Sequence, residues 1–131
     1  MAYIHPIEVR FRDLDALGHV NNAVLVSYLE QGRFQWWRDY LAGRPFQEEG
    51  FLIARVEVDY RKPIHFGDEV EVELRCARVG NSSFELSYRV LRGQNHVLLA
   101  EAKTVQVMVD LSMQRPIPIR ETTRQWLEGQ R

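Results

Sequence analysis

The segment from Asp13 to Asn22 brings carboxylates, an imidazole and two carboxamides together directly before a long apolar-periodic stretch. It reads Asp-Leu-Asp-Ala-Leu-Gly-His-Val-Asn-Asn. A carboxylate can act as a general base or a nucleophile, and the start of a helix presents unpaired N–H groups with a partial positive charge. Together these groups are suited to adding water to a carbonyl carbon. The segment is therefore the candidate catalytic site.

A helix of about five turns is predicted to follow this segment. From Asn21 or Asn22 to about Leu41, one face repeats at helical spacing while polar residues fall opposite. The residues of that face are Leu25, Leu29, Gly32, Trp36 and Tyr40. Asn21 or Asn22 is a natural N-cap, because an Asn side chain accepts from the free N–H groups of the first turn, and Gly43 is placed to end the helix.

Alternating apolar and polar residues predict strands in five further segments. These are residues 7–11, 55–61, 70–76, 84–90 and 97–109. Their connections are rich in Gly, Pro, Asn and Asp, which favours antiparallel neighbours in a meander. In the last segment the apolar residues fall on even-numbered positions at first and on odd-numbered positions later. This change predicts a bulge near Thr104 or burial on both faces, and we favour the bulge. A short helix is predicted over residues 120–129.

These elements predict an α+β domain in which one long helix is wrapped by a curved antiparallel sheet of about five strands. The outer face of several strands carries charged residues. The sheet leaves two unpaired edges, and dimerisation through one of them would cover it.

Length and composition indicate a single soluble domain over residues 1–131. The chain is 45% hydrophobic and 27% charged, and 17 Lys and Arg against 18 Asp and Glu give a net charge of −1. No global field therefore favours nucleic acid or an anionic membrane as partner. Cys76 is alone and cannot form an internal disulfide, and the N-terminus lacks the pattern of a signal peptide, so a cytoplasmic protein is expected. No apolar run approaches the roughly 18 residues of a membrane span.

The residues from Asp13 to Ala23, followed by Tyr28-Leu-Glu-Gln-Gly-Arg33, resemble the signature of hotdog-fold acyl thioesterases, the 4-hydroxybenzoyl-CoA thioesterase-like superfamily. Within it the chain is similar to bacterial acyl-CoA thioesterases and, in this segment, to plant acyl-carrier-protein thioesterases. Residues 58–63, 66–68 and 109–118 also resemble the family, so the likeness covers nearly the whole chain. It implies hydrolysis of an acyl thioester to a free acid and CoA without a cofactor. It also implies a homodimer or homotetramer with the acyl site at the subunit interface.

The resemblance assigns the catalytic carboxylate to Asp15. A carboxylate with a reference pKa of about 3.9 is ionised at neutral pH, so Asp15 could activate water or attack the carbonyl directly. The other interpretation is that Asp15 only caps a turn. The backbone N–H of Asn22, or of a neighbour such as Ala23, is expected to stabilise the oxyanion at the helix N-terminus. Asp13 is expected to stabilise the loop or to cap the end of a strand.

Gly18 and His19 lie between these two groups. Gly18 can adopt backbone angles that fold the loop back or admit a ligand close to the main chain. His19 matches a histidine that plant acyl-carrier-protein thioesterases use, and a structural role is the alternative. Leu17 departs from the plant pattern, which has asparagine there, and this weakens the assignment of proton transfer to His19.

Substrate contacts are expected from Leu25 and Tyr28 on the acyl side, although core packing explains such residues equally well. Arg61, Lys62 or Arg78 could bind the phosphates of CoA, and the alternative is that each belongs to a solvated, charged strand face. Glu30 lies about 12 Å along the helix from Asn22, so a surface pair with Arg33 is the expected use.

Other site chemistry receives little support from the sequence. Asp59 is on the outward face of its strand and is not assigned a role. Cys76 is expected to be a small core residue, and no spacing of histidine, cysteine and carboxylate groups predicts a metal site.

Two further function classes are alternatives to an acyl-CoA thioesterase. A non-catalytic module that binds acyl-CoA or acyl carrier protein could use the same slot. A hotdog hydratase is a third class, but its histidine-containing motif is not apparent in this sequence.

Overall fold

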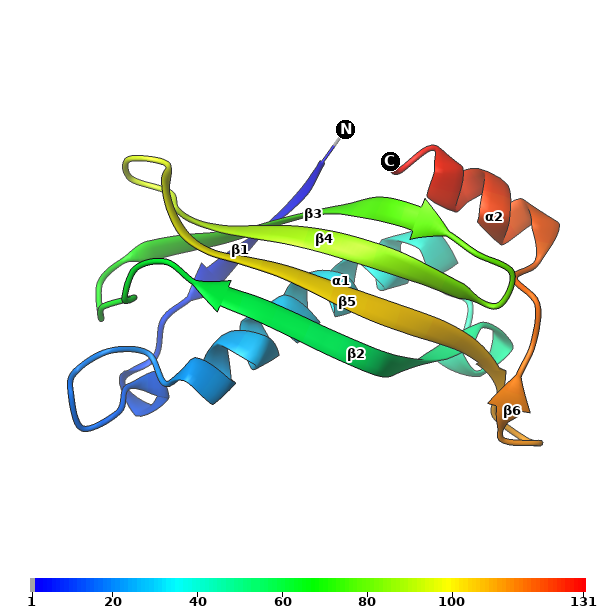
Figure 1. Cartoon of the computed structure of the whole chain (residues 1–131), viewed down its shortest axis with the longest axis horizontal. Coiled ribbons are helices and arrows are strands. Elements are labelled where there is room, and N and C mark those ends of the chain that lie inside the picture. The colour runs from blue at the N-terminus through cyan, green and yellow to red at the C-terminus, as the bar shows by residue number, and fades with distance from the viewer. Residues whose placement is uncertain (1) are drawn as a thin grey trace.

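The computed structural model describes residues 2–131, and it shows a curved antiparallel sheet wrapped around one long helix (Figure 1). The strands are β1 (Tyr3–Glu8), β2 (Gly50–Tyr60), β3 (Glu69–Val79), β4 (Ser83–Arg92), β5 (Val97–Asp110) and the short β6 (Arg115–Pro116). The helices are α1 (Asn22–Leu41) and α2 (Glu121–Glu128), with 3-10 turns at Phe11–Asp13 and Phe46–Glu48. The predicted α+β arrangement is confirmed.

The long helix α1 begins and ends where local chemistry requires it. The Asn21 side chain accepts a 2.8 Å hydrogen bond from the Ala23 N–H, which confirms an Asn N-cap. At the other end, Ala42 and Gly43 have φ values of 50° and 92°, so the chain turns into the left-handed region and leaves the helix.

One face of α1 packs against the sheet very closely. Leu25, Leu29 and Trp36 are buried on this face. A Cβ added at Gly32 would lie 3.0 Å from Val72 Cγ1 on β3, so glycine allows the helix and the strand to approach. This contact keeps α1 at a fixed position under the sheet.

The strand order is β1-β3-β4-β5-β2, and it corrects part of the expected meander. The β3-β4-β5 hairpins follow one another as predicted, but β2 pairs with β5 and not with β3. The reason lies in residues 61–68. The N–H groups of Arg61 and Lys62 both donate to the Leu99 carbonyl, and the Val20 N–H donates to the Ile64 carbonyl. The connection therefore passes the start of α1 and leads from the edge strand β2 to β3, on the far side of β5 and β4.

The prediction that the buried side chains of β5 switch from even-numbered to odd-numbered positions is wrong. The even-numbered residues from Ala100 to Met108 are all buried, so no switch of face occurs near Thr104. Two register shifts occur along β5. One lies opposite Val90 and Leu91 on β4, and the other lies between Ile53 and Arg55 on β2, opposite Gln106 and Val105. Thr104 and Gln106 are buried polar residues that find hydrogen-bond partners inside the protein, and an apolar count cannot recognise such positions as inward-facing.

The first strand and the last helix agree in part with the prediction. β1 ends at Glu8, before the predicted limit, and Phe11 lies in a 3-10 turn with 79% of its surface exposed. The terminal helix is present as α2, and its Trp126 stacks on Tyr40 at 4.2 Å between ring centroids. α2 therefore covers the C-terminal half of α1.

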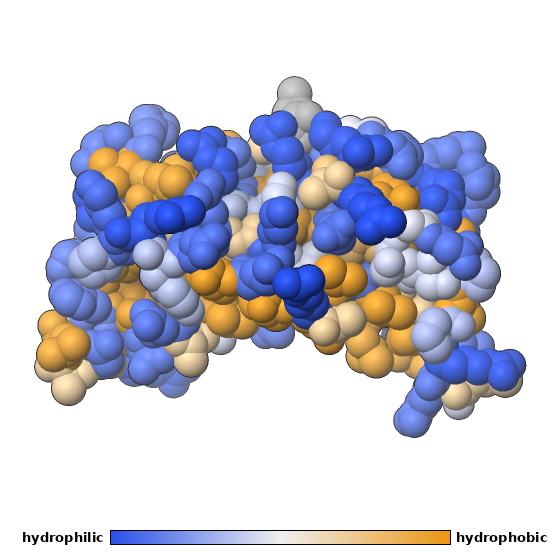
Figure 2. Space-filling model, viewed as in Figure 1, coloured by the Kyte–Doolittle hydropathy of each residue, from blue (hydrophilic) through white to orange (hydrophobic). Residues whose placement is uncertain are grey.

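Strand β2 is an edge strand with exposed apolar side chains. Leu52, Ile53 and Val56 are 59%, 37% and 41% exposed, and within residues 2–131 only β5 pairs with β2. In Figure 2 apolar residues gather along the lower margin, where Figure 1 places β2. An unpaired edge with apolar side chains is suited to pairing with another chain.

None of the helices within residues 2–131 combines the length and the apolar character needed to cross a membrane.

Candidate active site

A cavity of about 360 Å³ lies at the N-terminal end of α1, and we call it the α1 N-terminal cavity. The loop before α1, the first turn of α1 and the segment that follows β2 form its walls. The lining residues are Asp15, Leu17, His19, Val20, Asn22, Leu25, Tyr60, Arg61, Lys62, Pro63 and Ile64. Six of the site residues that the sequence singled out therefore share one cavity, namely Asp15, His19, Asn22, Leu25, Arg61 and Lys62.

Asp15 closes a tight turn and lines the cavity. Its Oδ1 accepts hydrogen bonds from the N–H groups of Leu17 and His19, at 2.9 and 3.4 Å. Gly18, with φ of 81°, allows the chain to fold back so that its N–H donates to the Asp15 carbonyl. Among the described residues Oδ2 makes no hydrogen bond. The turn and a chemical role are therefore compatible, because they use different oxygens.

The first turn of α1 offers a free donor at Asn22. The Ala23 N–H is taken by the Asn21 cap, and the N–H groups of Val24 and Leu25 donate to the Asn21 carbonyl. The Asn22 N–H has no acceptor within residues 2–131. It lies at the positive end of the helix dipole, where an oxyanion is favoured.

Tyr60 holds the first turn of α1 from the neighbouring strand. Its hydroxyl donates a 2.6 Å hydrogen bond to the Asn22 carbonyl, and its ring lines the cavity. No sequence pattern predicts this contact, because Tyr60 is 38 residues away along the chain.

Asp13 anchors the loop, as expected. Its carboxylate is buried and accepts from the N–H and guanidinium of Arg10 and from the Tyr28 hydroxyl. Burial alone would raise the pKa of Asp13, but the hydrogen bonds from Arg10 and Tyr28 outweigh burial and lower that pKa. Its carbonyl accepts from the N–H of Asn21, at 2.9 Å. The Asp13 contacts thus fix the distance between the loop and the helix.

Tyr28 and Gly18 are not among the residues that line the α1 N-terminal cavity. Burial, followed by the hydrogen bond to Asp13, raises the pKa of the Tyr28 hydroxyl, which therefore stays a donor. Within one chain Tyr28 positions the loop, and its contact with substrate stays a prediction.

His19 lies beside a second histidine that the sequence reasoning missed. The rings of His19 and His65 meet edge to face, with centroids 4.9 Å apart, and the two backbones form an isolated bridge. His65 is 46 residues beyond His19 in the chain, so only the crossing of residues 61–68 brings the two together.

Two cationic side chains line the cavity, and they differ in whether they form an ion pair. Arg61 forms an ion pair with Glu101 at 2.8 Å. Lys62 has no ion-pair partner in the part of the chain that the structure describes. Lys62 is therefore the more available group for an anion, whereas Arg61 would have to share its charge. Arg78 lies elsewhere and pairs with Glu85 at 3.8 Å.

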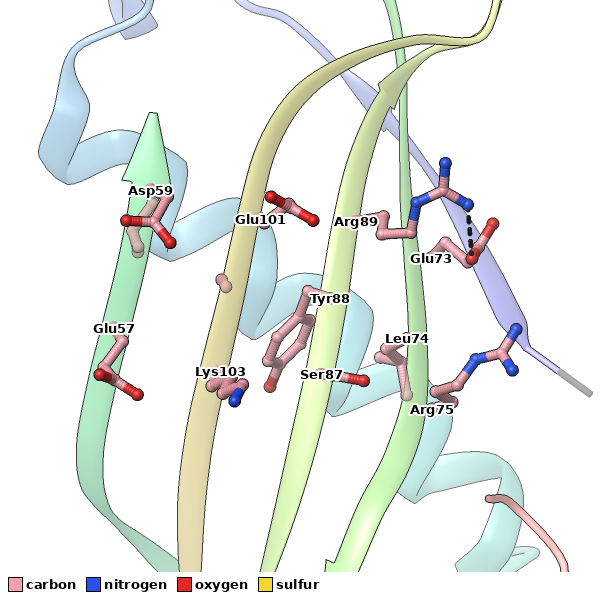
Figure 3. A pocket seen from close by; sticks show the side chains of 12 residues that line it. Glu57, Asp59, Glu73, Leu74, Arg75, Ser87, Tyr88, Arg89, Glu101 and Lys103 are labelled. Carbon is pink, nitrogen blue, oxygen red and sulfur yellow. Dashed lines mark hydrogen bonds and ion pairs between the residues drawn. The ribbon is translucent and has the colours of Figure 1, made fainter. Parts of the chain in front are cut away.

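Glu30 and Asp59 lie outside this cavity. Glu30 pairs with Arg33 at 3.9 Å, as predicted, but the pair is not on the surface as a whole, because Glu30 is exposed and Arg33 is buried. Asp59 lies on the outer face of the sheet, in a shallow hollow of about 760 Å³. Figure 3 shows acidic and basic side chains there on the side away from α1, including the Arg89 and Glu73 pair at 3.4 Å. This hollow has no helix N-terminus beside it and no apolar wall of the kind an acyl group needs.

No cluster of three or more potential metal ligands occurs within residues 2–131. Cys76 is buried, and burial raises the pKa of its thiol to about 11, which fits a small core residue and not a nucleophile.

The chain is similar to known proteins over most of its length. A model of the thioesterase-like superfamily matches residues 9–127. The 1,4-dihydroxy-2-naphthoyl-CoA hydrolase of Synechococcus elongatus is 27% identical over 129 residues, which cover 92% of this chain and 90% of that protein.

Two solved structures have the same fold. One is a predicted thioesterase from Bacillus stearothermophilus, with a TM-score of 0.91, 27% identity and coverage of 99% of this chain and 96% of that one. The other is a thioesterase complexed with coenzyme A and Zn from Thermus thermophilus, with a TM-score of 0.86, 38% identity and coverage of 96% and 91%.

Proposed function

The chain belongs to the thioesterase-like superfamily and has its hotdog fold, and from this premise we propose that it is an acyl-CoA thioesterase. It hydrolyses an acyl thioester to a free carboxylic acid and CoA. The observation that carries the proposal is the shared cavity of the Asp15 carboxylate and the unpaired N–H of Asn22. Relatives named as acyl-CoA hydrolases support the substrate class.

In the proposed reaction the thioester carbonyl oxygen accepts a hydrogen bond from the Asn22 N–H. As the carbonyl carbon becomes tetrahedral, negative charge gathers on this oxygen, and the helix dipole stabilises it. Tyr60 keeps the first turn of α1 in place through the Asn22 carbonyl. The preorganised donor needs no rearrangement during the reaction.

Asp15 acts through its free oxygen Oδ2 by one of two routes. As a general base it takes a proton from water while the water oxygen bonds to the carbonyl carbon. As a nucleophile it bonds to that carbon itself and forms a mixed anhydride, which water then hydrolyses. In both routes the carbon–sulfur bond breaks and the thiolate of CoA leaves. Both routes begin from the ionised carboxylate.

The remaining residues have supporting parts in the proposal. Gly18 shapes the turn, and His19 lies at the cavity wall, where it can donate to the bound substrate or exchange a proton with the leaving group. Lys62, with Arg61, binds phosphate groups of CoA at the cavity mouth. Leu25 contacts the acyl group.

We also propose that the whole chain is one domain that works as a homodimer in the cytoplasm. Antiparallel pairing of two β2 edges would cover Leu52, Ile53 and Val56 and would remove an unpaired edge. Pairs of such dimers would give a homotetramer. Acyl carrier protein is an alternative carrier for the acyl group.

The proposal is tested by replacing Asp15 with Asn and measuring thiol release from a panel of acyl-CoA substrates. We expect kcat to fall by about a hundredfold or more, because a catalytic base or nucleophile contributes at least that factor. The matched control is Asp39→Asn, which changes an exposed carboxylate in the C-terminal half of α1 that does not line the α1 N-terminal cavity.

Two outcomes would contradict the proposal. Full turnover by the Asp15→Asn protein would reject the catalytic assignment. Failure of the wild-type protein to hydrolyse any thioester, combined with tight binding of acyl-CoA, would favour a non-catalytic binding module.

A further inference from the structure

A second cavity, of about 480 Å³, lies between the C-terminal half of α1 and the start of β2. We call it the Arg33 cavity. Its walls are mostly apolar and aromatic, with Phe34, Phe46, Phe51, Ile53 and Leu111 among its lining residues. Apolar cavities with one or two placed polar groups are the usual form of a site for an organic group.

The polar group of this cavity is the guanidinium of Arg33, a residue of which only 6% is exposed. A guanidinium has five N–H donors. Within residues 2–131 only one hydrogen bond of this group is found, from Nη1 to the Tyr88 hydroxyl at 3.1 Å. Glu30 lies 3.9 Å away, and its side chain is 72% exposed at the rim. A buried cation with one neutral hydrogen-bond partner, and with its nearest carboxylate 3.9 Å away on the exposed rim, is costly unless something else accepts from it.

The hydrogen bonds behind Arg33 fix its orientation. Because a guanidinium can only donate, the Tyr88 hydroxyl accepts from it and must donate onward to Thr104 Oγ1, at 2.6 Å. Thr104 then donates to Gln106, whose amide donates to the Phe84 carbonyl at 3.0 Å. Each hydroxyl in this chain of hydrogen bonds accepts from the side of Arg33 and donates away from it. The chain of hydrogen bonds therefore stabilises the positive charge and holds it at the cavity wall.

The other buried charged group of the cavity is already neutralised. Glu49 is buried, but its carboxylate accepts from the Arg44 guanidinium at 3.0 Å and from the Thr123 hydroxyl. It is therefore not a partner for Arg33. Among the described residues, Arg33 is therefore the buried charged group of this cavity that lacks a close ionic partner.

The Arg33 cavity and the α1 N-terminal cavity lie at opposite ends of β2. Phe51 and Ile53 line the first, and Tyr60 lines the second. Antiparallel pairing of two β2 edges brings the Phe51 end of one copy beside the Tyr60 end of the other. In such a pair the two α1 helices also run antiparallel. Arg33 lies eight residues before Leu41, the last residue of α1, which is about 12 Å along the helix axis.

We propose that the Arg33 cavity of one copy receives the far end of the acyl group bound in the α1 N-terminal cavity of the other. Arg33 selects acyl groups that carry an oxygen acceptor, above all a carboxylate, at the end remote from the thioester. This inference rests on the proposed thioesterase function and its β2-paired dimer. The aromatic walls enclose the middle of the acyl group, and Arg33 pairs with its polar end.

The test compares octanoyl-CoA with octanedioyl-CoA, which has a carboxylate in place of the terminal methyl group. We expect the wild-type protein to favour octanedioyl-CoA in kcat/KM by about tenfold to a hundredfold, the usual worth of a hydrogen bond to a charged group. In Arg33→Met, of similar length but without charge, this ratio should fall to one or below. A merely structural role of Arg33 would lower both values and leave their ratio unchanged.

The wild-type ratio decides the inference even if Arg33→Met fails to fold. Equal turnover of the two substrates, or preference for octanoyl-CoA, would overturn the inference and leave the thioesterase proposal standing. If no thioester is hydrolysed at all, the thioesterase proposal fails. Calorimetric binding of the two thioesters to the Asp15→Asn protein then measures the same preference without turnover, and equal affinities would overturn the inference.

Discussion

The Tyr28 hydroxyl donates a 2.7 Å hydrogen bond to the buried carboxylate of Asp13, and this bond joins the second turn of α1 to the loop that carries Asp15. The Asp13 carbonyl accepts from the Asn21 N–H at the start of the same helix. The carboxylate of Asp15 and the free N–H of Asn22 are therefore held at a fixed separation by contacts that involve neither residue. Asp13 and Tyr28 act as positioning residues.

Replacing Tyr28 with Phe should lower the free energy of unfolding by about 1.5–3 kcal/mol, the usual worth of a hydrogen bond to a charged group. Equilibrium urea denaturation measures this change. The matched control is Tyr40→Phe, which removes a half-buried bond between two neutral hydroxyls, to Thr123 at 2.7 Å, and should cost about 1 kcal/mol. Equal costs for the two variants would show that the charge of Asp13 is not important to this contact.

The lowered pKa of Asp13 predicts an acid-sensitive contribution to stability. The folded-state pKa lies below the unfolded value of about 3.9, so the unfolded chain binds the proton more readily. The contribution is complete above the unfolded pKa and is lost as the pH falls through the folded pKa. Wild-type protein should therefore lose more unfolding free energy below about pH 4 than Asp13→Asn does. Parallel curves of unfolding free energy against pH for the two proteins would contradict this.

The local parts of the site could be predicted from the sequence, and the non-local parts could not. The cap at Asn21 and the turn at Gly18 depend on neighbouring residues, and both are present. Tyr60 and His65 reach the site only because residues 61–68 cross the end of α1, and the position of β2 beside β5 decides that path. Turn chemistry alone cannot specify it.

Buried polar groups are the second reason why sequence and structure differ. Thr104 and Gln106 face α1, but their residue types favour the opposite side of β5. They are tolerated there because each has a hydrogen-bond partner, in a chain of hydrogen bonds that begins at Arg33. Spacing along the helix pairs Arg33 only with Glu30, since it cannot reveal a contact with Tyr88 on β4.

Replacing Val56 with Lys should convert the proposed dimer to monomers. Val56 lies in the middle of the β2 edge and is 41% exposed, and a lysine on an edge strand opposes pairing with another strand. Sedimentation velocity measures the change in mass. The matched control is Ile4→Lys on β1, the strand at the other edge of the sheet, where 52% of Ile4 is exposed. A wild-type monomer, or dissociation by Ile4→Lys alone, would contradict pairing through β2.

Replacing Asn22 with Pro removes the backbone N–H that is proposed to bind the oxyanion, and the fold should tolerate it. Asn22 is the first residue of α1, where proline is favoured because its missing N–H has no helical partner. The preceding residue, Asn21, has φ of −58° and ψ of 137°, the extended geometry that a following proline requires. The Asn22 carbonyl remains available to the Tyr60 hydroxyl.

The expected result of Asn22→Pro is a fall in kcat of about a hundredfold to a thousandfold, the usual cost of removing one oxyanion donor. The free energy of unfolding should stay within about 1 kcal/mol of the wild-type value, because proline at this position preserves the helix. Asn22→Ala is the matched control, since it removes the side chain and keeps the N–H, so it should retain kcat. If Asn22→Ala loses as much activity as Asn22→Pro, the side chain and not the backbone carries the chemistry. If neither variant loses activity, the oxyanion is stabilised elsewhere, and the first turn of α1 serves only to shape the cavity.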